Sequence, residues 1–125
     1  MTRGGKTILV IDDDEVIRSL VQKILNRAGY DTVLTCTGEE GLEELRCCPE
    51  EIHLVIVDHT LEGLSGADLV NALRSEVPDI PVIISSGENI DLANLPAGQR
   101  PHASILKKPY RVSDLNDAVM VALES

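Results

Sequence analysis

The chain has 125 residues, about the size of one domain, and its 43% hydrophobic and 26% charged residues are typical of a folded protein. Eleven basic and twenty-one acidic side chains give a formal charge of −10, the wrong sign for gripping a phosphate backbone. With no Trp, no Phe and two Tyr, it also lacks platforms on which single-stranded bases stack. We therefore expect one domain over residues 1–125 that makes no direct contact with nucleic acid.

The cysteines and the N-terminal segment favour a cytoplasmic protein. Three cysteines, of which Cys47 and Cys48 are adjacent, form neither a disulfide framework nor a metal-ligand spacing. No apolar run approaches the ~20 residues of a membrane span, and the segment before the first apolar run is short and polar. These features predict reduced thiols, a cytoplasmic location and no membrane association.

Five short runs rich in Ile, Val and Leu predict β-strands. Three of them are continuous rather than alternating, which is typical of parallel strands that are buried on both faces. The predicted strands are Thr7–Ile11, Thr32–Cys36, Leu54–Val57, Val82–Ser85 and Ser104–Leu106.

Helical spacing of apolar residues follows the first strand most clearly. An apolar stripe runs from Val16 to Ala28, with Asp13 or Asp14 as its N-cap and Gly29 at its end. Later helices are predicted over about Glu39–Arg46, Gly66–Ser75 and Ser113–Leu123, with Ser113 as the cap of the last one.

The interval between the fourth and fifth strands predicts an irregular loop, because Pro96, Gly98 and Pro101 interrupt residues 88–102. Alternation of strand and helix elsewhere predicts an α/β fold, a doubly wound five-stranded parallel sheet with helices on both faces. Ligands bind such sheets beyond the carboxyl ends of the strands, where the winding reverses.

Polar side chains follow four of the predicted strands. Asp12 and Asp13 follow the first, Asp58 the third, Ser86 the fourth and Lys108 the fifth. With strand order 2-1-3-4-5 the first and third strands are neighbours, so the three aspartates meet. Two carboxylates ~5 Å apart repel by roughly 3 kcal/mol at an effective dielectric near 20, so the cluster must take up a proton or bind a cation.

A hard divalent ion suits this cluster. Its ligands are oxygens, and a site with few carboxylates that leaves room for water favours Mg²⁺ over Ca²⁺, with Mn²⁺ as a substitute. Such a site, with a lysine opposite and a hydroxyl beside it, is suited to receive a phosphoryl group. Asp58, at the end of a central strand, is the better nucleophile, while Asp12 and Asp13 share the metal.

Four segments together resemble the receiver domain of bacterial two-component response regulators, the CheY-like family with a flavodoxin-like fold. The segments are Ile8–Asp14, Leu54–Asp58, Pro81–Gly87 and Lys107–Tyr110, and the resemblance extends over the whole chain. It also includes the receivers attached to hybrid sensor kinases, so both a stand-alone regulator and a module of a longer protein fit.

The resemblance implies a role for each matching position. Asp58 is the phosphoacceptor, and Mg²⁺ is held by Asp12, Asp13, Asp58 and the backbone carbonyl of Thr60. Ser86 and Lys108 bind the phosphoryl group, with a cis bond after Lys108. The implied donor is a phosphohistidine on a sensor histidine kinase or histidine phosphotransfer protein. The implied role is a phosphorylation-controlled switch rather than a metabolic enzyme, although the domain takes part in its own phosphorylation and dephosphorylation.

Two positions depart from the family pattern. Glu62 stands where Pro is frequent in this family. Ile105 stands where an aromatic ring usually changes rotamer as the switch hydroxyl moves, so this chain lacks the ring through which the family usually couples phosphorylation to its outer face. Thr60 and Glu88 stand at the two positions that tune acyl-phosphate lifetime in this family.

Two other functions compete with this one. A haloacid-dehalogenase-like phosphatase would use Asp12 as its nucleophile. That assignment leaves Asp58 without a role, and a chain of 125 residues leaves few residues for a substrate-binding cap. A pseudo-receiver that binds a partner constitutively is suggested by Glu62 and Ile105, and the intact set of acidic residues argues against it.

Overall fold

The computed structural model describes residues 6–58, 66–77, 79–87 and 102–124. Strands and helices alternate along the chain, except that β5 follows β4 across residues outside the described ranges. The strands are β1 (Thr7–Ile11), β2 (Asp31–Thr35), β3 (Leu54–Asp58), β4 (Val82–Ser86) and β5 (Ala103–Lys107). The helices are α1 (Glu15–Arg27), α2 (Gly38–Cys47), α3 (Gly66–Glu76) and α4 (Val112–Glu124).

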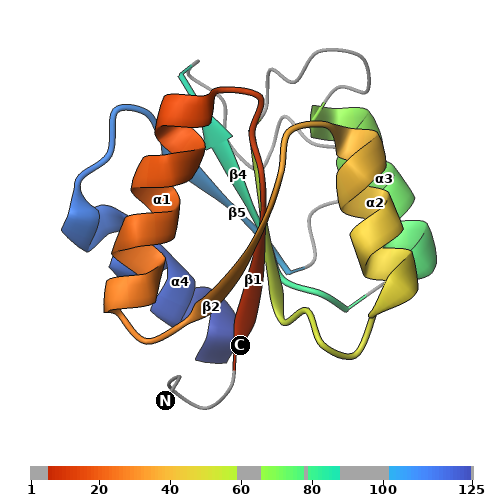
Figure 1. The fold of residues 1–125 in the computed structure, drawn as a ribbon. Helices are drawn as coiled ribbons and strands as arrows, with labels where there is room; N and C mark the ends of the chain where they lie inside the picture. Colours follow the sequence, from red (N-terminus) through yellow and green to blue (C-terminus); the bar gives the residue numbers. More distant parts are fainter. Residues whose placement is uncertain (1–5, 59–65, 78, 88–101, 125) are drawn as a thin grey trace.

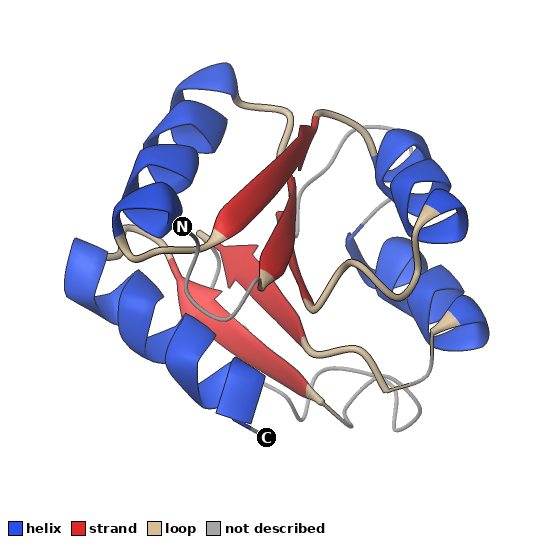
Figure 2. Ribbon diagram, turned by 60° about the horizontal axis from the view of Figure 1, so that its bottom comes forward, coloured by secondary structure: helices blue, strands red, loops and turns tan. Residues whose placement is uncertain are grey.

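All strand pairs are parallel, and the sheet has the order β2-β1-β3-β4-β5. Helices α1 and α4 cover one face, and α2 and α3 cover the other (Figures 1 and 2). The predicted doubly wound α/β sheet, its strand order and its helices on both faces are confirmed. The winding reverses between β1 and β3, which are neighbours in space although β2 and α2 separate them in the chain.

Alternation along the strands divides the core into two layers, because successive side chains point to opposite faces of a sheet. In β1, Leu9 and Ile11 pack in the layer under α2 and α3, whereas Ile8 and Val10 pack in the layer under α1 and α4. Both layers are almost wholly aliphatic. The continuous apolar runs of the sequence thus reflect strands that are buried on both faces.

Helix α1 begins and ends as its sequence predicts. The Asp14 side chain accepts hydrogen bonds from the backbone N–H groups of Val16 and Ile17, so Asp14 is the N-cap. Gly29 takes a positive φ of 98° just after the helix, and the Tyr30 N–H then donates to the Leu25 carbonyl.

Other boundaries differ from the sequence prediction. Strand β2 ends at Thr35 because Cys36 turns its backbone N–H and thiol toward the Glu40 carboxylate. Helix α4 begins at Val112, so Ser113 lies in its first turn and is not the cap. Instead, the Asp114 side chain accepts a hydrogen bond from the Arg111 N–H, one half of a capping box.

The predicted irregular loop lies outside the described residues except for His102, which has a positive φ of 60°. Among the helices of the described ranges, none has both the length and the apolar character that crossing a membrane requires.

Candidate functional site

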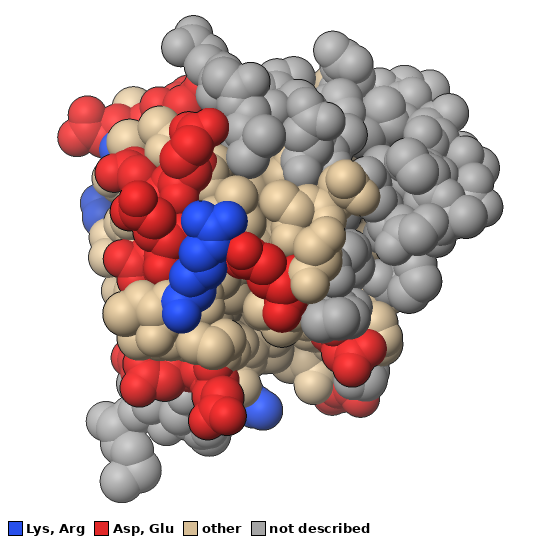
Figure 3. All heavy atoms as spheres, turned by 90° about the vertical axis from the view of Figure 1, so that its right-hand side faces the viewer, with Lys and Arg blue, Asp and Glu red and all other residues tan. Residues whose placement is uncertain are grey.

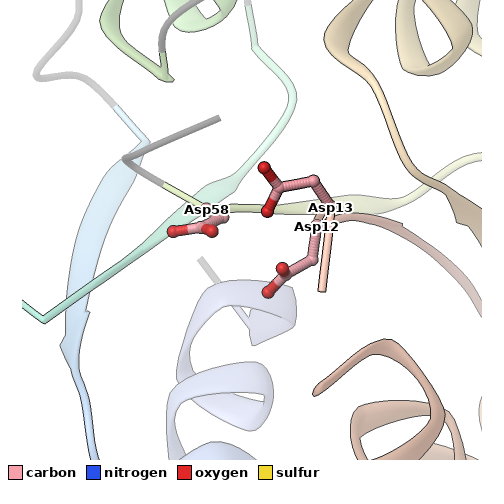
Figure 4. A group of neighbouring side chains, drawn as sticks. All are labelled: Asp12, Asp13 and Asp58. Atoms are coloured by element: carbon pink, nitrogen blue, oxygen red, sulfur yellow. The ribbon is translucent and has the colours of Figure 1, made fainter. Parts of the chain in front are cut away.

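Three aspartates meet at the carboxyl edge of the sheet, between β1 and β3. The register pairs Ile11 of β1 with Val57 of β3. The residues that follow them, Asp12 and Asp58, are therefore neighbours. One oxygen of each of Asp12, Asp13 and Asp58 lies within 4.8 Å of the others. Figure 4 shows the three carboxylates gathered around the ends of the two strands. The predicted cluster therefore exists, and the winding of the sheet creates it.

Asp12 is the most constrained of the three. It is only 4% exposed, its Oδ1 accepts a hydrogen bond of 2.9 Å from the Asp14 N–H, and its backbone carbonyl accepts one of 2.8 Å from Arg18 Nη1. Burial raises the pKa of Asp12 above its usual value, the charge on Asp58 adds to this rise, and the Asp14 N–H and Lys108 oppose it. Hydrogen bonds thus hold Asp12 in a buried position where its negative charge is unfavourable.

Lys108 supplies a positive charge to the cluster. Its Nζ lies 3.3 Å from Asp58 Oδ1 and 3.8 Å from Asp12 Oδ2. The backbone explains this approach, because the Lys108 N–H donates a 2.7 Å hydrogen bond to the Ser86 carbonyl and ties the segment after β5 to the end of β4. The bond between Lys108 and Pro109 is cis, as predicted. The structure therefore places Lys108 against Asp58, and it places Ser86, which is fully buried, at the end of the adjoining strand.

One ammonium group does not balance three carboxylates. At an effective dielectric near 20, each carboxylate pair ~5 Å apart contributes roughly 3 kcal/mol of repulsion, and these repulsions are relieved by a divalent cation. All side-chain donors of the cluster are oxygens, the ligands that Mg²⁺ prefers. Within the described ranges this is the only group of three acidic, histidine or cysteine side chains with such spacing. The donor set therefore fits the expected ion.

Two side chains near the cluster were not predicted. Arg18, one turn into α1, holds the loop after β1 through the Asp12 carbonyl. Tyr110 packs at the edge of the layer under α1 and α4, and burial followed by the charge on Asp12 raises its pKa, while the Ser85 hydroxyl lowers it. Arg18 has no sequence feature that separates it from ordinary surface residues. Tyr110 is one of only two aromatic residues and ends the segment Lys107–Tyr110, but the sequence assigned it no role in the site.

Several predicted positions fall outside the described residues: Thr60, Glu62 and Glu88. Ile105, which replaces the expected aromatic residue, is half-buried in β5 and packs against the layer under α2 and α3.

Comparisons with known proteins agree with the fold. The model of the family described as "Response regulator receiver domain" matches residues 8–120. The chain is 30% identical over 111 residues to the DNA-binding transcriptional regulator NtrC of Rhizobium meliloti (strain 1021), covering 89% of this chain and 22% of that protein. It is 30% identical over 123 residues to the sensor kinase CckA of Brucella abortus (strain 2308), covering 97% of this chain and 13% of that protein.

The same similarity appears in three dimensions. A response regulator receiver domain protein from Clostridium thermocellum superposes with a TM-score of 0.86 at 30% identity, and the match covers 95% of this chain and 94% of that one. The chain thus spans a small part of the two longer relatives and nearly all of the receiver structure. It belongs to the response regulator receiver domain family, the signalling domain of two-component systems.

Proposed function

We propose that Asp58 accepts a phosphoryl group from the phosphohistidine of a sensor histidine kinase or histidine phosphotransfer protein, in a Mg²⁺-dependent reaction. The observation that carries the proposal is the pair of contacts around Asp58. A buried carboxylate, 5% exposed, lies beside two further carboxylates and 3.3 Å from the Lys108 ammonium. A receiver of this kind is a switch that is turned on by phosphorylation and turned off by loss of the phosphate.

Asp12, Asp13 and Asp58 would hold the ion, with the backbone carbonyl of Thr60, which lies outside the described residues, as a further ligand. When bound, Mg²⁺ neutralises negative charge on the phosphoryl oxygens and on the carboxylates that face them. Mn²⁺ offers the same coordination chemistry and would substitute for it.

The chain's own residues carry the transfer. An Asp58 carboxylate oxygen attacks phosphorus, the P–N bond to the donor imidazole breaks, and the imidazole leaves with the bonding electrons while an aspartyl phosphate forms. Lys108, already within ion-pair distance, would move its ammonium from the carboxylate to a phosphoryl oxygen. Hydrolysis reverses the state, because water attacks phosphorus and releases inorganic phosphate from Asp58.

The Ser86 hydroxyl would donate a hydrogen bond to another phosphoryl oxygen, and its movement on phosphorylation would be passed on to β4 and β5. The family's usual aromatic partner is absent at Ile105, so this step must involve other side chains on these strands. The match covers 22% of NtrC and 13% of CckA, so the output of these relatives involves parts of their chains that lie outside the match.

Intact-mass analysis tests the proposal. Incubation with acetyl phosphate and Mg²⁺ should add one phosphoryl group to the wild-type chain and none to Asp58→Asn, and omission of Mg²⁺ should prevent the addition. The exposed Asp117→Asn variant is the matched control and should be phosphorylated normally.

Three results would contradict the proposal. Phosphoryl incorporation that survives Asp58→Asn would assign the nucleophile elsewhere. Turnover of a generic phosphomonoester that is lost in Asp12→Asn but kept in Asp58→Asn would favour a phosphatase of the haloacid dehalogenase kind. Absence of Mg²⁺ binding at millimolar concentrations would instead favour a pseudo-receiver.

A further inference from the structure

Two adjacent thiols lie at the C-terminal end of helix α2. Cys47 is the last residue of the helix, and Cys48, the C-cap, donates its backbone N–H to the Glu44 carbonyl at 3.1 Å. The two Sγ atoms lie 3.3 Å apart. Cys47 is exposed and Cys48 is partly exposed, so both sulfurs are open to a small ligand.

This pair lies at the opposite edge of the sheet from Asp58. Helix α2 runs antiparallel to the strands it covers, so its C-terminal end reaches the edge at which β1 begins (Figure 1). The phosphoacceptor cluster lies where β1 and β3 end. Any ligand of the two thiols is therefore separate from the chemistry proposed for Asp58.

The separation of the sulfurs discriminates between ligands. A tetrahedral Zn²⁺ with Zn–S bonds of about 2.3 Å holds two thiolates about 3.8 Å apart, wider than the observed pair, and it needs two more ligands. The described residues offer no group of three metal-binding side chains here. At 3.3 Å, bonds of about 2.3 Å to both sulfurs enclose an angle of about 90°, close to what a pyramidal trivalent centre adopts.

The surroundings disfavour oxidation as the chemistry of this pair. The hydrogen bond to Cys47, burial and nearby negative charge, including Glu51, raise the pKa of Cys48 to about 11. Reaction with peroxides follows thiolate character, which is small for such a thiol. Exposed glutamates flank the pair on α2 and after it, and Figure 3 shows acidic side chains gathered over this side of the molecule, which repels anionic reagents. A neutral ligand is not repelled by this negative charge.

We propose that Cys47 and Cys48 form a chelating dithiol that binds one neutral trivalent arsenical, such as arsenous acid or an organic arsenoxide. Thiols are soft ligands and bind soft centres such as trivalent arsenic in preference to hard ones. The reaction involves no change of oxidation state: two As–S bonds form and two S–H bonds break. The oxygen of an arsenoxide leaves with both protons as one water, whereas two hydroxyl groups of arsenous acid leave with one proton each as two waters. The first As–S bond brings the arsenic beside the second sulfur, so the second bond forms at high effective concentration.

Phenylarsine oxide is the probe that tests this site. The reduced wild-type chain should gain one phenylarsenic group per molecule by intact mass, with loss of one water. The adduct should survive a wash with excess 2-mercaptoethanol, a monothiol, and should be released by 2,3-dimercaptopropanol, a dithiol.

Variants separate chelation from ordinary thiol reactivity. Cys47→Ser and Cys48→Ser should each weaken retention by about 10²-fold or more, because only the monodentate bond remains. Cys36→Ser removes the third, exposed thiol and should leave retention unchanged. Circular dichroism checks that each variant is folded. Asp58→Asn should bind the probe as the wild type does, so failure of the phosphoacceptor assignment and failure of this site are distinguishable.

Three results would overturn the proposal: removal of the wild-type adduct by the monothiol wash, retention by folded Cys47→Ser or Cys48→Ser equal to that of the wild type, or loss of the adduct in Cys36→Ser. Chelation should also raise the midpoint of thermal unfolding of the wild type, because the ligand binds the folded arrangement of the two sulfurs. No such rise should occur in the two serine variants.

Discussion

The middle of β1 and the residue that follows it are equally buried and have opposite effects on stability. Leu9 is fully buried in an aliphatic layer, and Asp12, three residues on, is 4% exposed. Burial of the first removes apolar surface from water and stabilises the fold. Burial of the second places a charge near two like charges, which raises the pKa of Asp12 and destabilises its ionised form.

The same contrast recurs on β3, where Val57 is fully buried among apolar side chains and Asp58 is 5% exposed beside Lys108. A strand can thus pass from a stabilising to a destabilising environment within one residue. Stability comes from the middle of the strands, and the carboxyl ends hold like charges whose repulsion Lys108 offsets only in part. Buried like charges that lower stability are expected mainly at functional sites.

The largest effect is expected in the middle of a strand. Leu9→Ala should lower the free energy of unfolding by about 2–5 kcal/mol, because it removes a buried side chain and leaves a cavity in the layer under α2 and α3. Urea denaturation followed by circular dichroism measures this. Leu20→Ala on α1, where the side chain is 49% exposed, is the matched control and should change stability by about 0.5 kcal/mol or less. Equal effects at both positions would refute the assigned core.

A smaller effect of opposite sign is expected at the carboxyl end. In Mg²⁺-free buffer at neutral pH, Asp12→Asn should raise the free energy of unfolding by about 1 kcal/mol, since it removes one of three crowded charges whose repulsion Lys108 only partly offsets. The amide oxygen keeps the acceptor for the Asp14 N–H. The exposed Asp117→Asn on α4 is the control and should have almost no effect. A clear loss of stability in Asp12→Asn would show that the aspartate stabilises the fold.

The pH dependence of this gain follows from the raised pKa of Asp12. The pKa of Asp12 in the folded state lies above its unfolded value of 3.8, so the protonated carboxyl group favours folding. This contribution is fully present below pH 3.8 and is lost as the pH rises through the folded-state pKa. The advantage of Asp12→Asn over the wild type should therefore be present at neutral pH and disappear as the solution is acidified toward pH 4. An advantage that grows on acidification would contradict the assigned environment.

The smallest effect is expected at Asp14, which lies beside the cluster but belongs to helix α1. Asp14→Ala removes the N-cap acceptor of two backbone N–H groups and should lower the free energy of unfolding by about 1 kcal/mol. Mg²⁺ affinity measured by calorimetry should stay close to that of the wild type, because Asp14 is outside the group of three carboxylates. A large loss of Mg²⁺ affinity would show that the cluster extends further.

The parts of the molecule that follow local patterns were predictable from the sequence. Apolar runs located all five strands. Parallel strands end at one edge, and the strand order 2-1-3-4-5, which makes the first and third strands neighbours, predicted that Asp12, Asp13 and Asp58 meet. The cap at Asp14 and the end of α1 at Gly29 follow from the chemistry of a helix terminus.

The remaining features depend on contacts between distant parts of the chain. Nothing in the local sequence indicates that Arg18 reaches the Asp12 carbonyl or that His53 Nδ1 accepts the Thr7 N–H across 46 residues. Ser113 was predicted as a cap from its residue type, but the hydrogen bond from the Arg111 N–H to Asp114 accompanies a helix that begins at Val112, two residues earlier than a cap at Ser113 would allow. Such competition between equally suitable groups is decided by packing.

The most direct test of the central claim compares wild type and Asp12→Asn in thermal unfolding as Mg²⁺ is added. The claim is that the carboxyl end of the sheet is a cation site whose charges destabilise the empty protein. Without Mg²⁺ the variant should be the more stable of the two, and a ligand at 100 times its Kd should stabilise the wild type by about 2.7 kcal/mol and reverse the order. A variant that stays more stable at every Mg²⁺ concentration, or a wild type that does not respond to Mg²⁺, would contradict the claim.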